Sequence, residues 1–501
     1  MRHAHNPLPP ITSKDDLQRY LTEAATLEHQ FMAQYLYAAF SLKKDPDDRC
    51  SAAEFEFVRR WASTIYRIAR QEMEHLSIVN SVLTAIGGQP YFGHVGSFPA
   101  QTRWYQQEAL AAKRSGPLAA NLGAVPPPCD IEFHLERFSP ATARRFACME
   151  SPHLGVVVEA DRADLLRWCY QDEAGRCPSI AAGPEAGSGG ALRAAAAPRA
   201  PSLLGDPPDD VEIGTVQDLY DAIDDGLRRL DAQLGPKALF SGHCSGQSEI
   251  PSEYDIYLFP ICDLSTALAG TKLVKTQGEG IDEAPGAESH YQMFVDIARE
   301  YEALLGTNPA FEPSRPLPLD PTPDQYRDPA TARAAQAFHT GYVTLLAMLT
   351  GYYSRWSASE WKQSPFLLQM LEQGAFAPMM TMLVRSLAEV VALLPANDGG
   401  PAGVSFDLTR GELDLLARPT DPIYDDILFY AAPLDEVVRA LEQVLEQPLA
   451  DEVRPPLTFI VQNVTRMVRN LVYNYQKGVY PRFDGSNPEN TCQPATGCDC
   501  E

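Results

Sequence analysis

Two polar residues interrupt the apolar stripe of a long segment with helical periodicity, residues 53–86. Glu72 and His75 stand in register with apolar residues of this stripe, at positions where its spacing calls for Leu or Val. A carboxylate among core residues loses several kcal/mol of hydration unless a partner compensates it. A metal ion is an economical partner, because a Glu oxygen and a His nitrogen three residues apart project from one helix face. The alternatives for this pair alone are surface polarity or a buried ion pair.

The preceding helical segment, residues 14–42, carries a matching acidic residue. Glu28 lies in the middle of its apolar stripe, and Ser13 followed by Asp16 indicates where the helix begins. Dimetal carboxylate bundles take one Glu from each of two helices and Glu-x-x-His from each of two others. The two segments therefore match half of such a bundle.

Further metal ligands are expected from the Gly-rich stretch after the predicted helix 257–276. Glu279 lies in Gln277-Gly278-Glu279-Gly280, and His290 follows in Ser289-His290-Tyr291. A loop can bring a carboxylate and an imidazole to one metal as a helix does. The alternative is a helix C-terminus with Glu279 in solvent and His290 capping the next helix.

Other acidic residues and one histidine have weaker patterns. Glu150 either braces the bundle or reaches the metal, and Asp221 and Asp224 leave the source of a fourth carboxylate open. Glu74, two positions after Glu72, is expected to face solvent. His29 is expected to lie at the surface or behind the metal ligands.

The chain is predicted to be all-α, with a four-helix bundle and an additional C-terminal helical region. Alternating strand patterns are nearly absent, and a Pro-rich passage at 308–324 separates two sets of helical segments. We expect a metal-binding bundle over 1–307, a C-terminal helical region over 325–480 and a loose tail over 481–501. Within the first unit, the Ala, Gly, Pro and Ser composition of 174–210 predicts a disordered insertion. The predicted helices are 14–42, 53–86, 138–150, 215–234, 257–276, 290–305, 329–354, 366–394, 432–447 and 457–476.

Composition excludes two classes of partner. The formal net charge of −25 argues against binding to nucleic acid or to anionic membranes, both of which need a basic surface. No apolar run of about 18 residues predicts a transmembrane helix, and no signal peptide is evident. The ten cysteines are scattered and predict no disulfide framework, so a cytoplasmic location fits best. Cys492, Cys498 and Cys500 have no partners at zinc-finger spacing.

Six motifs carry a resemblance to known proteins: Leu27-Glu28-His29, Gln34-Tyr35-Leu36-Tyr37, Glu72-Met73-Glu74-His75-Leu76, Ala85-Ile86-Gly87-Gly88, Gln277-Gly278-Glu279-Gly280 and Ser289-His290-Tyr291. Taken together, these motifs resemble those of the iminophenyl-pyruvate dimer synthase family. The chain looks like the ferritin-like domain of this family, which is associated with bisindole pigment assembly of the violacein and rebeccamycin type. The resemblance covers residues 14–305 and extends into the C-terminal helices at Leu394-Pro395 and Ala402-Gly403. The pigment synthases are much longer chains, and Glu279 and His290 depart from the one-turn Glu-x-x-His of ferritins.

The resemblance implies a ferritin-like bundle that binds iron, two ions being expected, although another divalent metal is an alternative. It implies oxidative chemistry on an amino-acid-derived imine in secondary metabolism, in a pocket that we expect Tyr35 and Tyr66 to wall. The alternatives are a metal-binding scaffold without turnover and a protein whose C-terminal half binds a partner. A small-molecule substrate and a pathway enzyme or second copy are the expected partners. The implied iron ligands are Glu28, Glu72, His75, Glu279 and His290, with Glu150 as an additional candidate.

Overall fold

The computed structural model describes residues 10–92, 98, 131, 133–152, 157, 159–169, 215–242, 244, 256–280, 288–355, 371, 375–419 and 421–476. The predicted insertion 174–210 and the tail 481–501, with its three cysteines, lie outside these residues.

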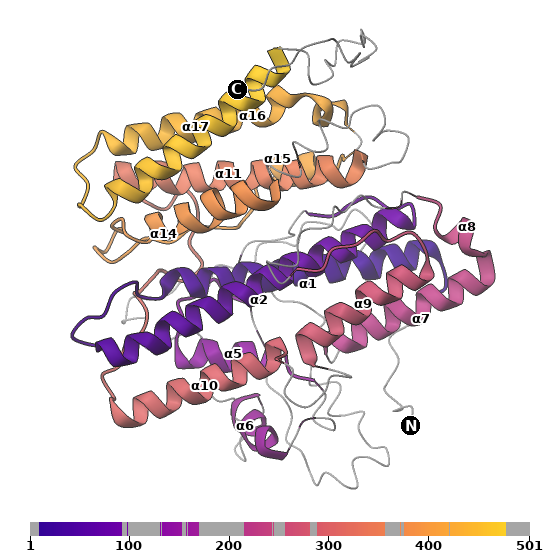
Figure 1. The fold of residues 1–501 in the computed structure, drawn as a ribbon, viewed down its shortest axis with the longest axis horizontal. Coiled ribbons are helices and arrows are strands. Elements are labelled where there is room, and N and C mark those ends of the chain that lie inside the picture. The colour runs from indigo at the N-terminus through magenta and orange to yellow at the C-terminus, as the bar shows by residue number, and fades with distance from the viewer. Residues whose placement is uncertain are drawn as a thin grey trace, which may run out of the picture.

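Two long helices form the spine of the molecule. Helix α1, Lys14–Ser41, and helix α2, Ala52–Ala85, begin at Ser13 and Ser51, whose side chains each accept from the backbone N–H three residues on. The acidic side chain at that third position accepts a hydrogen bond from the backbone N–H of the cap residue. Both contacts satisfy N–H groups that would otherwise lack partners. The two helices pack along most of their length (Figure 1). The start predicted at Ser13 and Asp16 is confirmed.

Shorter helices complete the N-terminal layer as two pairs. Helix α5, Pro140–Met149, packs on α10, His290–Thr307, and α7, Val216–Leu234, packs on α9, Leu264–Glu279 (Figure 1). Helix α9 begins later than the predicted residue 257, because Asp263 caps it at Leu264. Helix α6, Glu159–Cys169, was not predicted, and neither was the four-residue α8, Pro236–Leu239.

The C-terminal helices lie in a second layer beside α1 and α2 (Figure 1). Helix α11 packs on α16, and α16 packs on α17. A π-helical stretch and α14 occupy the predicted helix 366–394, whereas the short α15 and a 3-10 turn were not predicted. The elements are α11, Pro329–Arg355; η3, Ala375–Leu387; α14, Ala388–Val391; α15, Arg410–Leu416; η4, Pro422–Asp425; α16, Ile427–Leu445; and α17, Arg454–Gln476.

The all-α prediction is confirmed for the residues that the structure describes. Their only β pairing consists of three isolated bridges. One bridge joins Leu42 to Ser314, and the adjacent Arg315 N–H donates to the Ser41 carbonyl at 2.7 Å. The Pro-rich passage therefore lies against the end of α1 before the chain enters the second layer.

Polar contacts join the two layers. Glu389 of α14 accepts hydrogen bonds from Tyr66 at 2.6 Å and from Lys44 at 2.8 Å. Further along, His29 of α1 is hydrogen-bonded to the Tyr342 hydroxyl of α11. Because Tyr66, His29 and Tyr342 are buried, their pairing fixes how the layers meet.

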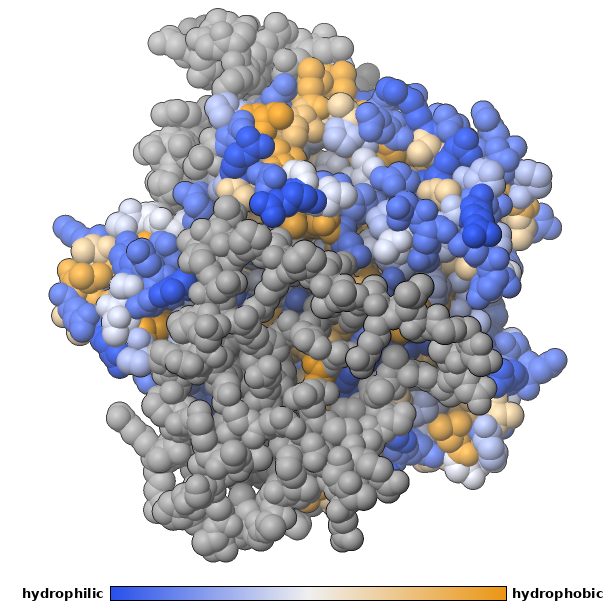
Figure 2. All heavy atoms as spheres, turned by 180° about the vertical axis from the view of Figure 1, so that it is seen from behind, coloured by the Kyte–Doolittle hydropathy of each residue, from blue (hydrophilic) through white to orange (hydrophobic). Residues whose placement is uncertain are grey.

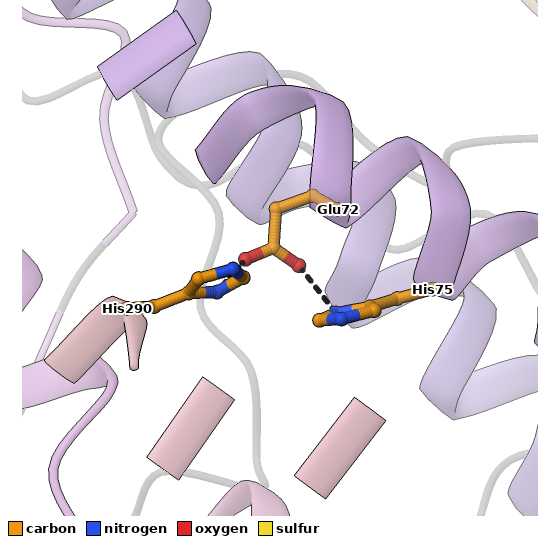
Figure 3. A group of neighbouring side chains, drawn as sticks. All are labelled: Glu72, His75 and His290. Atoms are coloured by element: carbon orange, nitrogen blue, oxygen red, sulfur yellow. Dashed lines mark hydrogen bonds and ion pairs between the residues drawn. The ribbon is translucent and has the colours of Figure 1, made fainter. Parts of the chain in front are cut away.

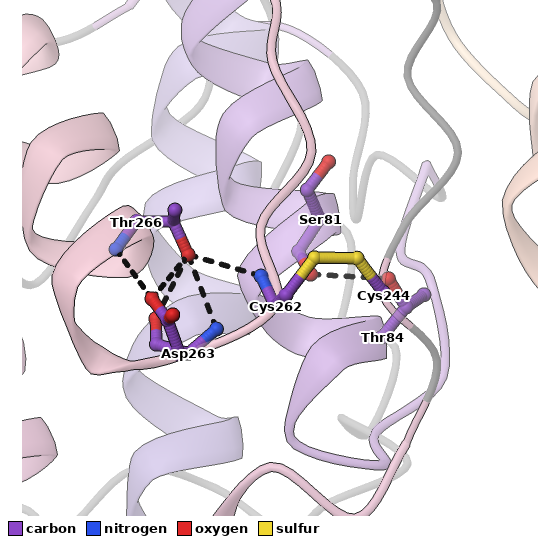
Figure 4. Close-up of a disulfide and its surroundings, with 6 residues drawn as sticks. All are labelled: Ser81, Thr84, Cys244, Cys262, Asp263 and Thr266. Atoms are coloured by element: carbon purple, nitrogen blue, oxygen red, sulfur yellow. Dashed lines mark hydrogen bonds between the residues drawn. A yellow bond between two sulfur atoms is a disulfide. The ribbon is translucent and has the colours of Figure 1, made fainter.

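Two disulfides are present, although the scattered cysteines predicted no disulfide framework. Cys148–Cys169 joins α5 to α6, and Cys244–Cys262 ties the chain after Gly242 to the residues just before α9 (Figure 4). Such links restrict the unfolded chain and so stabilise the folded one.

The described surface is mainly polar on the face seen in Figure 2, with apolar residues in small separate groups. Among the helices of the described ranges, none is both long and apolar enough to cross a membrane.

A glycine in α7 tests the packing of this layer. A Cβ on Gly226 would lie 2.8 Å from Ile11 Cβ, so we expect Gly226→Ala to lower the free energy of unfolding by about 1–3 kcal/mol. The matched change Gly306→Ala in α10 meets no atom within 4 Å, and we expect it to be neutral or slightly stabilising. Urea unfolding of both variants measures this, and equal stability of the two would contradict the described packing.

Candidate metal centre

Glu72 lies between two imidazoles in the middle of the N-terminal layer. Its Oε2 atom is 3.1 Å from His75 Nδ1, and its Oε1 atom is 2.9 Å from His290 Nδ1 (Figure 3). All three residues are buried, and their ligand atoms lie within 4.8 Å of one another. The Glu72 carboxylate therefore contacts both imidazoles, each through a different oxygen atom.

Glu28 joins the His75 side of this cluster. Its Oε2 atom is 3.4 Å from His75 Nδ1, and its side chain is 1% exposed. The close packing of α1 on α2 brings the two residues together. The sequence prediction that Glu28, Glu72 and His75 converge agrees with this geometry.

Glu150 joins the His290 side. Ser289 caps α10 and makes His290 its first residue, while Glu150 directly follows the last residue of α5. Because α5 packs on α10, Glu150 Oε1 comes to 3.6 Å from His290 Nδ1. Both side chains are buried.

Glu279 is the last residue of α9 and points inward. Gly280 ends the helix with φ 74°, a left-handed conformation that glycine adopts without a Cβ clash. Glu279 Oε1 accepts from the Gln217 N–H at 2.7 Å, and a Cβ on the adjacent Gly278 would lie 3.7 Å from Glu150 Oε2. The alternative with Glu279 in solvent is wrong, since its side chain is 4% exposed. Its ligand atoms are not part of the tight three-residue group.

Two tyrosines donate to the outer carboxylates. The Tyr35 hydroxyl donates to Glu150 Oε1 at 2.5 Å, and the Tyr220 hydroxyl of α7 donates to Glu28 Oε1. The sequence predicted that Tyr35 walls a pocket here, but it did not single out Tyr220. Tyr66 is not brought to the cluster, because its hydroxyl is bound to Glu389 and its ring lies against Arg385.

Both imidazoles present Nδ1 to the carboxylates and bind a glutamine through Nε2. His75 Nε2 is 2.8 Å from Gln277 Oε1, and His290 Nε2 is 3.1 Å from Gln71 Oε1. The expectation that Glu74 faces solvent is wrong, because α9 covers it and Gln277 Nε2 donates to its Oε2 at 3.2 Å.

Asp221 and Asp224, the two sequence candidates for a fourth carboxylate ligand, are bound to other side chains. Lys275 of α9 contacts Asp221 at 2.8 Å and Asp224 at 2.9 Å. Thr271 also donates to Asp224 at 2.5 Å. Glu150, not these aspartates, is the further carboxylate beside His290, and Glu279 lies on the Glu150 side of the cluster.

Burial shifts the acid-base behaviour of the cluster. It raises the pKa of Glu28 to about 7 against the opposing effect of His75, and it raises the pKa of Glu279 well above its usual range. Burial alone would lower the pKa of each histidine, but nearby carboxylates outweigh it, bringing the pKa of His290 to about 9 and that of His75 well above normal. For Glu72, burial opposes ionisation, yet His290 holds its pKa below the usual value.

The buried polar atoms of the cluster indicate that these residues fit a metal-binding role. Glu279 Oε2 is buried without a hydrogen bond from the part of the chain that the structure describes, and Glu72 Oε1 and His290 Nδ1 contact each other at 2.9 Å without hydrogen-bond geometry. Buried polar atoms normally have hydrogen-bond partners, so these atoms call for a partner. Carboxylate oxygen with imidazole nitrogen suits iron, zinc or manganese. Such a cation would displace the protons that the raised pKa values retain.

The tyrosine that donates to Glu150 offers a direct test of this geometry. We expect Tyr35→Phe to lower the free energy of unfolding by about 1.5–3 kcal/mol, because a buried carboxylate loses a donor. The matched change Tyr37→Phe removes a donor to the Pro318 carbonyl, a neutral acceptor, and should cost only about 0.5–1.5 kcal/mol. Denaturant unfolding measures both, and a larger loss for Tyr37→Phe would contradict the assignment.

Comparisons with known proteins agree with this architecture. A dichlorochromopyrrolate synthase from Lentzea aerocolonigenes is 25% identical over 446 residues, covering 80% of this chain and 36% of the relative. A 2-imino-3-(indol-3-yl)propanoate dimerase from Chromobacterium violaceum is 25% identical over 465 residues, covering 87% of this chain and 37% of the relative. The chain thus spans little more than a third of the length of these relatives.

A solved ferritin-like protein from Caulobacter vibrioides aligns with a TM-score of 0.36 and 18% identity, over 66% of this chain and 85% of its own. The ferritin-like family model matches residues 21–299, which is more than half of the chain and includes every residue of the cluster. The chain therefore belongs to the ferritin-like family.

Proposed function

We propose that the cluster is a two-metal centre, in which Glu72 would be the ligand shared by both halves. The observation that carries the proposal is the position of Glu72, whose two oxygens face two different imidazoles at 3.1 and 2.9 Å. His75 with Glu28 forms one half of the centre, and His290 with Glu150 forms the other. Glu279 would complete the second half through Oε2, since its Oε1 is held by Gln217.

Charge supports two divalent ions rather than one. Four carboxylates, Glu28, Glu72, Glu150 and Glu279, carry four negative charges when ionised. Two divalent cations balance them, with both imidazoles neutral. A single divalent cation would balance the site only if two of the carboxylates, such as Glu28 and Glu279 with their raised pKa values, kept their protons. We propose iron as the metal, because carboxylate and imidazole ligands in helical bundles form di-iron sites.

The reaction that we propose is an oxidation of an amino-acid-derived imine, including its oxidative coupling. Iron in such a site supplies redox chemistry with O2 or peroxide. The two relatives are named for making a chromopyrrolate and for dimerising an indolyl imino acid, and the proposal extends that substrate class to this chain. A further pathway enzyme or a second copy is proposed as partner.

The residues around the cluster would serve this chemistry by orientation and by excluding water. Tyr35 and Tyr220 hold Glu150 and Glu28 through their hydroxyls. The Tyr35 ring packs on Phe146 and Phe294 with centroids 4.7 and 4.9 Å away. This apolar shell lowers the local dielectric and strengthens each charge interaction inside it.

Metal content tests the centre. We expect protein loaded with Fe(II) under anaerobic conditions and then desalted to retain two iron ions per chain. Glu72→Gln should lower iron affinity at least about tenfold, because it removes the charge shared by both halves. The control Glu300→Gln changes a carboxylate bound to Arg60 and Trp61 of α2 and should retain iron. Metal analysis of all three proteins measures the iron that each retains. Wild-type protein that retains no iron would refute the proposed centre.

O2 uptake after Fe(II) addition tests the oxidative part separately. The wild-type protein should consume O2 faster than free Fe(II), and Glu72→Gln should not. Bound iron with no O2 uptake, alone or with an indolyl imino acid, would favour a metal-binding scaffold instead.

A further inference from the structure

The glutamine bound to His75 has a fixed orientation. Gln277 Nε2 donates to Glu74 Oε2 at 3.2 Å. An ionised carboxylate has no proton to donate, so it can only accept in this contact. The amide oxygen of Gln277 is therefore turned towards His75 Nε2, 2.8 Å away.

Glu74 is itself held in place. Its Oε1 atom accepts from the backbone N–H of Tyr257, and its side chain is 1% exposed. Glu74 sits two residues after Glu72 on α2, so it points towards α9 rather than towards the metal ligands. The backbone of one segment thus orients Glu74, and Glu74 orients Gln277.

This arrangement determines which nitrogen of neutral His75 carries the proton. Because Gln277 Oε1 only accepts, His75 Nε2 must donate, which leaves the lone pair on Nδ1. Nδ1 is the atom that lies 3.1 Å from Glu72 and 3.4 Å from Glu28. Without Gln277, those two carboxylates would favour the opposite tautomer, with the proton on Nδ1 and no free ligand atom there.

We propose that Gln277, oriented by Glu74, is a positioning residue that keeps His75 in the tautomer whose Nδ1 binds metal. The inference rests on the two-metal centre proposed above. Neither Glu74 nor Gln277 touches the metal, and each acts through the next group in the chain of hydrogen bonds. Outer contacts of this kind change metal affinity by about 10- to 100-fold.

Exchanging the two side chains provides a sharp test. In Glu74→Gln, the Tyr257 N–H still needs the side-chain oxygen, so the new amide nitrogen faces Gln277. Gln277 must then rotate and present its nitrogen to His75, which enforces the wrong tautomer. Adding Gln277→Glu restores every hydrogen bond, because the carboxylate accepts both from the new amide and from His75 Nε2. The single variant should lose affinity, and the double variant should regain it.

Anaerobic titration with Co(II), followed by its visible absorption, measures the affinity. We expect Glu74→Gln to weaken binding at least about tenfold and the double variant to return to within about threefold of wild type. The control Glu412→Gln alters another histidine–carboxylate contact, that with His339 at 2.9 Å, and should bind like wild type. Unchanged affinity in Glu74→Gln, or no recovery in the double variant, would overturn the proposal. Wild type without Co(II) binding would instead refute the metal centre itself.

A second measurement does not depend on the folding of any variant. In Zn(II)-loaded wild type, ring ¹⁵N spectra should show His75 bound through Nδ1, with a slowly exchanging proton on Nε2. Binding through Nε2 would overturn the proposal.

Discussion

The burial of Glu72 between two imidazoles is the constraint on which the rest of this layer depends. An ionised carboxylate with 1% exposure is tolerable only if charge and hydrogen bonds surround it. The imidazoles of His75 in α2 and His290 at the start of α10 supply the compensating charge. Three further carboxylates surround this group, from α1, the end of α5 and the end of α9. The helix pairs α1–α2 and α5–α10 are therefore positioned by their apolar faces and also by a shared polar centre.

The ends of short helices contribute as much to this centre as the long helices do. Glu150 and Glu279 stand at helix C-termini, and His290 stands at a helix N-terminus. Terminal positions let the backbone change direction at the ligand, so a carboxylate and an imidazole meet without one-turn spacing. This accounts for how Glu279 and His290 reach one region although ten residues separate them in the sequence.

Long segments with helical periodicity made most of the helices predictable, together with three residues of the metal centre. Helices α1, α2, α7, α10, α11 and α17 follow their predicted ranges, since each buries a continuous apolar stripe. Helix α15 spans seven residues and α6 has a weak stripe, so neither gave a periodic signal. Glu28, Glu72 and His75 were predictable because they interrupt such stripes.

The remaining features depend on tertiary contacts that spacing does not encode. Glu150 reaches His290 only because α5 pairs with α10, and Tyr220 reaches Glu28 only because α7 lies on α1. Glu74 does face away from Glu72 as its spacing requires, but α9 covers that side. The disulfide partners of Cys148 and Cys262 likewise depend on which elements adjoin.

Anomalous X-ray scattering at the iron edge from crystals of the iron-loaded protein tests the central claim most directly. The account predicts two peaks on opposite sides of the Glu72 carboxylate, one beside His75 Nδ1 and the other beside His290 Nδ1. A single peak, or peaks away from Glu72, would contradict it.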